Sequence, residues 1–174
     1  MPAKSLYRFD FKSPVGVIRI SGDAEHIHEV IFADDENVSA NDDAAVLKEC
    51  AGQLDEYFSG KRISFSLPLH PEGTDFQKRI WSLLQKIPFG KTISYLDLAI
   101  AAGDRNLTRA VGLANGSNKL AIVIPCHRVI GSGGNLTGYA GGLWRKKWLL
   151  DFEQRDLQPE LFETEQLSKK HEGI

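Results

Sequence analysis

The sequence predicts a small α/β domain followed by a mostly helical domain with a helix-turn-helix. Three observations support this: alternating apolar residues near the N-terminus, helical spacing of apolar residues after residue 43, and two short capped helices before residue 116. With 174 residues, 42% of them hydrophobic, the chain can bury a sizeable core. We place the domains at residues 1–70 and 71–155, and expect a polar, disordered tail at residues 156–174.

The first domain is predicted from two sequence periods. Apolar residues alternate over residues 7–11 and 17–20, which predicts a hairpin, and residues 28–32 can add a third strand. From Asp43 the apolar residues follow helical spacing up to a stop signal at Ser59-Gly60. Cys50 lies on the apolar stripe of that helix, so we predict a structural role for it.

The second domain begins after a connector, residues 67–73, that contains two prolines. Thr74 has a glutamine three positions later, which predicts a capping box and a helix. Ser94 caps another helix in the same way, and Gly103 ends it. The positions of these caps predict helices that begin at about residues 75 and 95.

A further short helix is predicted at residues 107–114, with Asn106 as its N-cap. Two short helices joined by a glycine-containing turn are typical of a helix-turn-helix, which presents its second helix to DNA. This second helix carries Arg109 among small residues. A tightly packed helical hairpin without DNA contact is the alternative interpretation.

Charge is distributed unevenly along the chain, although the net charge is only −2. Residues 1–74 hold 7 Lys and Arg against 13 Asp and Glu, and residues 156–174 hold 2 against 5. Residues 75–155 hold 12 against 5. A basic block between acidic flanks favours a nucleic-acid surface on the second domain, and a solvated face of mixed charge is the alternative.

A cysteine beside a histidine follows an apolar run. Residues 120–124 are all apolar and rich in β-branched side chains, which predicts a buried strand that Pro125 ends. Cys126 would lie at the end of this strand, next to His127 and Arg128. Because the thiolate is the reactive form of cysteine, a neighbouring base or cation would favour nucleophilic chemistry.

The residues after this cysteine form glycine-rich segments and a last helix. Residues 131–135 and 138–142 match neither a phosphate-binding nor a dinucleotide-binding pattern, so they predict no cofactor. A helix is predicted over residues 143–154, with Glu153 near its C-terminal end. An acidic residue there opposes the helix dipole and needs a partner, for which His127 is a candidate.

Cysteine and histidine usage bears on metals and on the compartment. Two cysteines are too few for a disulfide framework, and His26 and His28 have no further cysteine or histidine at a known ligand spacing. We therefore expect no metal. The N-terminus lacks a signal-peptide pattern, and no apolar stretch approaches 18 residues, so we expect a cytoplasmic protein without a membrane partner.

Four motifs together resemble a known family. They are Pro125-Cys126-His127-Arg128-Val129, Ser94-Tyr95, Arg109-Ala110-Val111-Gly112 and Gly138-Tyr139-Ala140-Gly141-Gly142. In these motifs the chain resembles the O6-alkylguanine-DNA alkyltransferases, suicide proteins that repair alkylated bases, from about residue 54 to residue 153. The resemblance implies a ribonuclease-H-like first domain, no cofactor, and a monomer that binds double-stranded DNA through its minor groove.

The resemblance also implies residue roles. Cys126 would take the alkyl group from O6-alkylguanine or O4-alkylthymine and keep it as a thioether. His127 would act as base through a water, Glu153 would orient its imidazole, and Asn118 would brace the turn before the cysteine. The residues that would contact DNA or the flipped base are Tyr95, Arg109, Ala110, Gly112, Arg128, Tyr139 and Ala140.

Two positions depart from the family pattern. Lys119 follows Asn118 where the family usually has proline, which could loosen the turn or add a phosphate contact. Ala140 follows Tyr139 where some relatives have serine, which removes one hydroxyl donor to the base.

Three classes of function compete for this sequence. A DNA-repair alkyltransferase uses the thiol, the basic block and the two-helix motif together. A non-catalytic helix-turn-helix protein that binds DNA or lesions has no need of Cys126. A cysteine hydrolase has no need of Arg109 on a basic helix.

Overall fold

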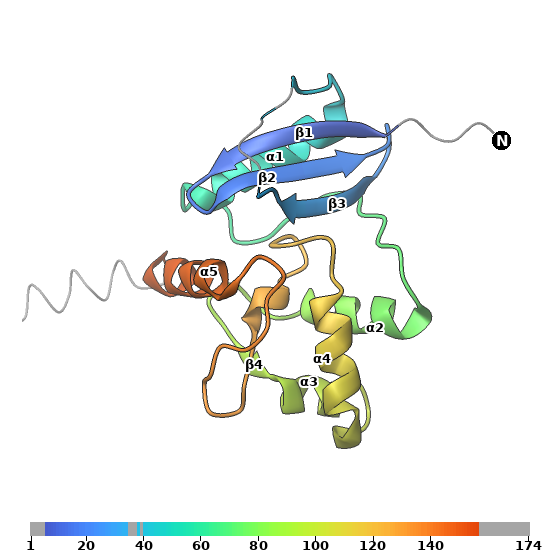
Figure 1. The fold of residues 1–174 in the computed structure, drawn as a ribbon, viewed down its shortest axis with the longest axis vertical. Coiled ribbons are helices and arrows are strands. Elements are labelled where there is room, and N and C mark those ends of the chain that lie inside the picture. The colour runs from blue at the N-terminus through green and yellow to red at the C-terminus, as the bar shows by residue number, and fades with distance from the viewer. Residues whose placement is uncertain (1–5, 35–37, 39, 157–174) are drawn as a thin grey trace, which may run out of the picture.

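The computed structural model of the protein describes residues 6–34, 38 and 40–156. Figure 1 shows a sheet with one helix against it at one end of the molecule and a group of helices at the other. The predicted combination of a small antiparallel α/β domain and a helical domain is confirmed. The expected disordered tail, residues 156–174, lies outside the described residues except for its first residue.

The sheet has three antiparallel strands in the order β1-β2-β3. They are β1 (Tyr7–Ser13), β2 (Gly16–Gly22) and β3 (Ile27–Phe32), so the predicted hairpin and third strand are confirmed. Gly16 has a φ of 99° at the hairpin turn, a backbone conformation that glycine adopts without strain. Ile20 on the inner face is fully buried, as the alternating pattern requires.

Helix α1 (Ala45–Phe58) packs against the sheet. Its apolar residues at helical spacing form the buried face, and Cys50 within that face is fully buried. Burial raises the pKa of Cys50 to about 12, so it stays a neutral thiol. The predicted burial of this cysteine in the core is confirmed.

The second domain contains four helices among the described residues. They are α2 (Asp75–Leu84), α3 (Tyr95–Ala101), α4 (Thr108–Gly116) and α5 (Leu143–Asp156). Helices α3 and α4 pack against each other as the predicted two-helix unit, and α2 packs against both (Figure 1).

The predicted capping boxes are present, but one predicted cap is wrong. The side chains of Thr74 and Ser94 each accept from the third residue of their helix, which fixes the starts of α2 and α3. Asn106 is not the N-cap of α4. The Asp104 side chain instead accepts from the Asn106 backbone at 2.8 Å and starts a short 3-10 helix, η1 (Arg105–Leu107), which leads directly into α4.

The cysteine segment forms a turn rather than a strand. The predicted strand over residues 120–124 is wrong: the Ile124 backbone donates to the Leu120 carbonyl at 2.9 Å, and Ile122 has a φ of 70°. Only Leu120 pairs with the sheet, in a single bridge to Val30. The turn leads into a second 3-10 helix, η2 (Cys126–Arg128).

A short parallel pair of strands follows η2. Strand β5 (Val129–Ile130) pairs with β4 (Ile93–Ser94), which directly precedes α3. This pairing joins the segment after Cys126 to the start of the two-helix unit. The candidate reactive residue and the candidate DNA-binding helix are thus held by the same small framework.

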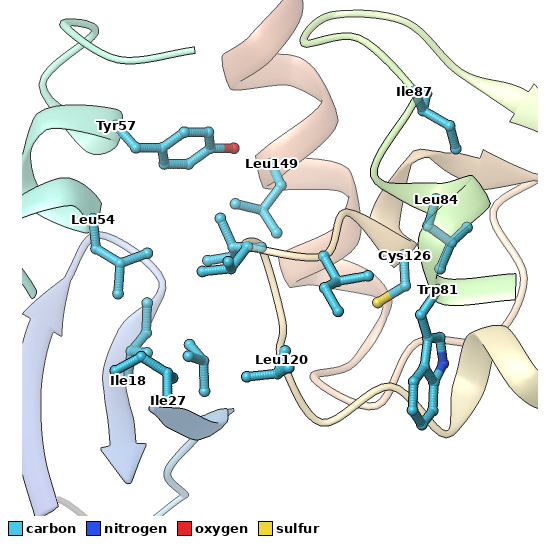
Figure 2. Packing of buried hydrophobic residues seen from close by; sticks show 14 of the residues in the cluster. Ile18, Ile27, Leu54, Tyr57, Trp81, Leu84, Ile87, Leu120, Cys126 and Leu149 are labelled. Atoms are coloured by element: carbon cyan, nitrogen blue, oxygen red, sulfur yellow. The ribbon is translucent and has the colours of Figure 1, made fainter. Parts of the chain in front are cut away.

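One hydrophobic cluster extends through both domains. It includes Ile18 and Ile27 of the sheet, Leu54 of α1, and Leu149 of α5. Figure 2 shows Tyr57 extending from α1 toward α5, across the boundary between the domains. No helix in the described ranges is both long and apolar enough to span a membrane.

Candidate active site

Cys126 is the first residue of η2 and only 5% exposed. Figure 2 shows its side chain within the hydrophobic cluster that also contains Trp81 and Leu84. Burial raises the pKa of the Cys126 thiol, and the Asn118 side chain and the Lys146 ammonium oppose this effect. In the resting protein the thiol is therefore protonated, so a reaction of the thiolate needs a base that removes the proton.

The turn before the cysteine is organised by Asn118. Its Oδ1 accepts from the Leu120 backbone at 2.9 Å, and its Nδ2 donates to the Ile124 carbonyl at 2.9 Å. The turn is formed with Lys119 at the position where the family usually has proline: the Lys119 carbonyl accepts from the Val30 backbone at 2.8 Å, a contact that a proline could also make. The Lys119 side chain is 72% exposed, with its ammonium 3.9 Å from Glu29 Oε1.

A second asparagine, Asn115, also supports the cysteine. It is buried near the end of α4, and its Nδ2 donates to the Cys126 carbonyl at 3.3 Å. The sequence analysis missed it, because an asparagine before a glycine is most simply interpreted as the end of a helix.

His127 and Glu153 form a buried pair, with 2.7 Å between His127 Nε2 and Glu153 Oε1. Burial lowers the pKa of His127 although Glu153 raises it, so the imidazole is neutral near pH 7. A carboxylate only accepts hydrogen bonds, so Nε2 carries the proton and Nδ1 is the basic nitrogen. The contact predicted from the position of Glu153 on its helix is confirmed.

Glu153 has more partners than His127. It accepts from Arg128 Nη2 at 2.9 Å, from the Tyr57 hydroxyl at 2.9 Å and from the Gly90 backbone at 3.3 Å. Burial alone would raise the pKa of Glu153, but His127 and Arg128 outweigh it and lower the pKa to about 2. The carboxylate is therefore ionised throughout the neutral range.

Arg128 lies inside the protein rather than on a DNA-facing surface. It is 5% exposed, and its Nη1 donates to the Ile87 carbonyl at 2.7 Å while Nε and Nη2 bind Glu153. We grouped it with the DNA-contacting residues from the resemblance alone. The structure instead places its charge where it compensates the buried Glu153 carboxylate.

Three buried polar atoms among the described residues have no hydrogen-bond partner. They are His127 Nδ1, Asn115 Oδ1 and the Tyr139 hydroxyl. His127 follows Cys126 in the chain, and Asn115 donates to the Cys126 carbonyl. Burial raises the pKa of the Tyr139 hydroxyl, and Cys126 raises it further. Because buried polar groups are normally paired, their concentration around one cysteine indicates a site prepared for a ligand or a transferred proton.

Lys146 supplies a buried positive charge at the same site. It is fully buried on α5, and its ammonium donates to the Val129 carbonyl at 2.6 Å and to the Thr137 carbonyl at 3.1 Å. Burial lowers the pKa of Lys146, and Cys126 raises it. The sequence analysis missed this residue, because a lysine on a charged helix normally faces solvent.

Tyr139 belongs to the glycine-rich segment over residues 138–142, and Tyr95 of α3 contacts the chain just before it. The Tyr95 hydroxyl donates to the Thr137 carbonyl at 3.0 Å. Tyr139 is half-buried and packs against the core, whereas Ala140 next to it is exposed. The structure thus brings the two predicted tyrosines to one loop.

Helix α4 presents an exposed face with one charged and one large apolar residue. Arg109 is exposed, and Leu113 one turn later is 70% exposed. Ala110 is half-buried, and a Cβ at Gly112 would lie 3.7 Å from the Tyr95 ring. Gly112 therefore faces a neighbouring side chain of the same domain, while Arg109 is free to reach a partner.

A group of possible metal ligands occurs in a different part of the chain. His28 of β3 lies close to His70 and Glu72 of the connector, with ligand atoms within 4.8 Å of one another. His28 Nε2 is 2.9 Å from Asp23 Oδ2. The sequence analysis missed this group, because the spacing of His28 and His70 in the chain does not resemble a ligand motif.

Family comparisons match nearly the whole described chain. Residues 4–71 match the model of the 6-O-methylguanine DNA methyltransferase ribonuclease-like domain, and residues 75–155 match that of the DNA binding domain of the same family. A methylated-DNA–protein-cysteine methyltransferase of Methanosarcina barkeri is 44% identical over 158 residues, which cover 88% of this chain and 100% of the relative.

Solved structures show the same similarity. The crystal structure of the Mycobacterium tuberculosis O6-methylguanine methyltransferase is 37% identical with a TM-score of 0.79, covering 87% of this chain and 94% of that one. The crystal structure of M. tuberculosis OGT in complex with DNA is 39% identical with a TM-score of 0.77, covering 87% of this chain and 93% of the other.

Proposed function

The chain belongs to the 6-O-methylguanine DNA methyltransferase family, and from this premise we propose that Cys126 is the residue that accepts the alkyl group. The protein is a methylated-DNA–protein-cysteine methyltransferase, which repairs DNA by moving an alkyl group from a modified base onto a cysteine of its own. Cys50 lies among apolar residues in the core of the first domain, whereas Cys126 lies next to His127 in the basic second domain, so Cys126 is the cysteine suited to this reaction.

The proposed transfer is a single displacement at carbon. The Cys126 thiolate attacks the alkyl carbon on guanine O6, an S–C bond forms as the C–O bond breaks, and the guanine leaves as an anion that takes up a proton. The product is a thioether that the protein cannot reverse, so each molecule reacts once. O4-alkylthymine presents the same alkyl–oxygen bond and is included in the proposed substrates.

We propose that the proton of the Cys126 thiol moves through a water to His127 Nδ1. The Glu153 carboxylate holds the proton on Nε2, which leaves Nδ1 as the acceptor and stabilises the imidazolium that forms. Asn118 holds the turn that presents Cys126 to the base. The observation that carries this mechanism is the partnerless Nδ1 of a neutral, buried histidine next to the cysteine.

The test of Cys126 is a mass measurement. After incubation with a duplex that contains one O6-methylguanine, the peptide that carries Cys126 should gain one methyl group, and the peptide that carries Cys50 should gain none. Cys126→Ser should still bind the duplex and leave the lesion in place. Duplex binding without any gain in peptide mass would contradict the proposal and favour a non-catalytic lesion-binding protein.

On the DNA side, we propose that the modified nucleotide leaves the helix before it reacts. A guanine O6 inside a stacked pair cannot align with a sulfur for backside attack, so the base must flip out. Arg109 on the exposed face of α4 would fill the space, Tyr95 would contact the rotated phosphate, and Tyr139 and Ala140 would line the base pocket. The small residues Ala110 and Gly112 would let α4 approach a narrow minor groove.

An Arg109→Ala variant tests base flipping. The variant should repair a duplex at least about tenfold more slowly, because alanine cannot fill the space that the flipped base leaves in the helix. Its reaction with free O6-methylguanine should stay at the rate of the unmodified protein, since no helix has to open. Equal losses on both substrates would contradict the flipping role.

The proposed reaction belongs in the cytoplasm. Both cysteines are free thiols in the structure, as a reducing compartment would keep them. Fractionation of cells that produce the protein would test this location directly.

A further inference from the structure

Arg145, in the first turn of α5, binds two segments that are far apart in the chain. Its Nε donates to the Val15 carbonyl at 2.8 Å, in the turn between β1 and β2. Its Nη1 donates to the Gly141 carbonyl at 3.0 Å, at the end of the segment that carries Tyr139. One planar guanidinium group thus joins the first domain to the segment of the second domain that carries Tyr139.

The same guanidinium lies between two aromatic rings. Its carbon is 4.8 Å from the centre of the Phe32 ring and 4.7 Å from that of Trp144. The side chain is 11% exposed, and its acidic neighbour, Asp34 at 3.7 Å, is 97% exposed. A pair with so exposed a carboxylate contributes little stability, so the contacts to carbonyls and rings define the position of Arg145.

Glycines allow this close packing. A Cβ at Gly141 would lie 2.5 Å from the Phe32 ring, so the backbone at Gly141 packs directly on a residue of β3. A Cβ at Gly16 would lie 3.1 Å from Arg145 Nη2. Phe32 also contacts Tyr139, with 5.9 Å between ring centres in an edge-on arrangement. The first domain therefore contacts Tyr139 through Phe32. The Arg145 guanidinium lies against the same Phe32 ring.

The segment that carries Tyr139 needs such anchors because much of it is exposed. Residues 132–135, 137, 138 and 140 are all exposed, so packing fixes little of it. Lys146 holds one end at the Thr137 carbonyl, and Arg145 holds the other at Gly141. Tyr139 lies between these two anchored points, and the Arg145 anchor connects the segment by hydrogen bonds to the first domain.

We propose that Arg145 is a positioning residue for alkyl transfer, through which the β1–β2 turn and Phe32 of the first domain set the position of Tyr139. This inference rests on the proposed roles of Cys126 and Tyr139. It gives the first domain a part in the reaction, although that domain supplies no reacting group. A small displacement of Tyr139, which would line the base pocket, lowers the rate of the chemical step more than it lowers duplex binding.

The test compares Arg145→Gln with Lys147→Gln, an exposed neighbour on the same helix that pairs with Asp151. Single-turnover transfer from an O6-methylguanine duplex gives a saturating rate and a half-saturating duplex concentration. Arg145→Gln should lower the saturating rate about tenfold and leave the half-saturating concentration within about twofold, because the α4 surface is unchanged. Lys147→Gln should leave both within about twofold.

A second variant, Phe32→Leu, keeps both hydrogen bonds of Arg145 and should also lower the saturating rate. If the two residues act through one contact, the double variant should lose little more rate than the worse single variant. Thermal unfolding of each variant shows that it is folded. Should Arg145→Gln fail to fold, Phe32→Leu alone decides the outcome.

A lowered unfolding temperature with an unchanged saturating rate would overturn the inference, because Arg145 would then only stabilise the fold. Full additivity in the double variant would overturn it as well. If the unmodified protein transfers no methyl group, the proposed function itself fails, whatever the variants do. The two failures are therefore distinguishable in the same experiment.

Discussion

Glu153 receives hydrogen bonds from three separate parts of the chain, which explains how an acidic residue is stable near the C-terminal end of a helix. The helix dipole disfavours a negative charge there. The Arg128 guanidinium and His127 Nε2, the Tyr57 hydroxyl and the Gly90 backbone N–H compensate for it within the core. The carboxylate therefore orients the imidazole and at the same time holds the two domains together.

The low pKa of Glu153 predicts a defined acid sensitivity. Because folding lowers the pKa from 4.5 to about 2, the ionised carboxylate stabilises the fold above pH 4.5, and this contribution is lost as the pH falls toward 2. The shift corresponds to at most about 3 kcal/mol. The unfolding free energy should fall more steeply over this range in the unmodified protein than in Glu153→Gln, measured by urea denaturation.

The control for acid unfolding is Asp151→Asn, an exposed carboxylate on the same helix. It should unfold with the pH dependence of the unmodified protein. Parallel curves for Glu153→Gln and the unmodified protein would show that Glu153 does not gain its stability from the ionised form.

Lys146 is predicted to assist the thiolate by its charge. In Lys146→Met the pKa of Cys126 should rise further, since the positive charge that opposes the effect of burial is removed. Each pKa unit of that rise lowers the fraction of Cys126 present as thiolate at neutral pH about tenfold. A higher pH should therefore restore part of the lost rate. The measurement is the pH dependence of single-turnover transfer, with Lys147→Met as the matched exposed control. A rate loss that is the same at every pH would exclude the electrostatic role.

Single residues differed in how well the sequence predicted them. The His127–Glu153 contact could be expected, because an acidic residue at a helix end needs a partner. Tyr57 could not, since it lies 96 residues from Glu153 in the chain and looks like one more apolar residue of α1. Asn115 and Lys146 could not either, because an asparagine before a glycine resembles a helix end and a lysine on a charged helix normally faces solvent.

At the scale of elements, the turn over residues 118–124 shows why that strand prediction was wrong. A run of β-branched residues favours a strand, but burial on all sides also suits a compact turn. Asn118 binds backbone groups at both ends of the run and closes it on itself. Ile122 adopts a φ of 70°, which is unfavourable for a β-branched residue, so the turn persists because its surroundings hold it.

An Asn118→Ala variant tests this account of the turn. It leaves the Leu120 amide without a partner in the core and removes one of the two donors to the Ile124 carbonyl, which should lower the unfolding free energy by about 1–3 kcal/mol. Methyl transfer should also slow, because the turn presents Cys126. Urea denaturation and single-turnover transfer measure the two effects.

The control is Ser117→Ala, next in the chain, which removes a half-buried hydroxyl that donates to the Ala114 carbonyl at 2.8 Å. It should cost no more than about 1 kcal/mol. An Asn118→Ala protein as stable as Ser117→Ala would mean that the apolar packing of residues 120–124, rather than the asparagine, holds the turn.

At the scale of the molecule, the sequence predicted the individual strands and helices better than the contacts that join the two domains. Strands β1–β3 and helices α1, α2, α3 and α5 follow from local periods and caps, so they could be expected. The single core through both domains depends on contacts such as Tyr57 with Glu153 and Arg145 with Val15. Local patterns carry no information on such contacts, and the division at residues 70 and 155 stays a prediction.

The uneven charge of the whole molecule predicts a strong salt dependence of DNA binding. Residues 75–155 carry 12 Lys and Arg against 5 Asp and Glu, and cations that neutralise phosphates release counterions. If about three to five of them do so, affinity for an unmodified duplex should fall roughly 40- to 500-fold between about 50 and about 200 mM salt. Arg105→Gln, exposed just before α4, should reduce the log–log slope by about 1, whereas Lys48→Gln in the first domain should leave it unchanged. A flat salt response, or equal slopes for all three proteins, would place the DNA elsewhere than on the basic second domain.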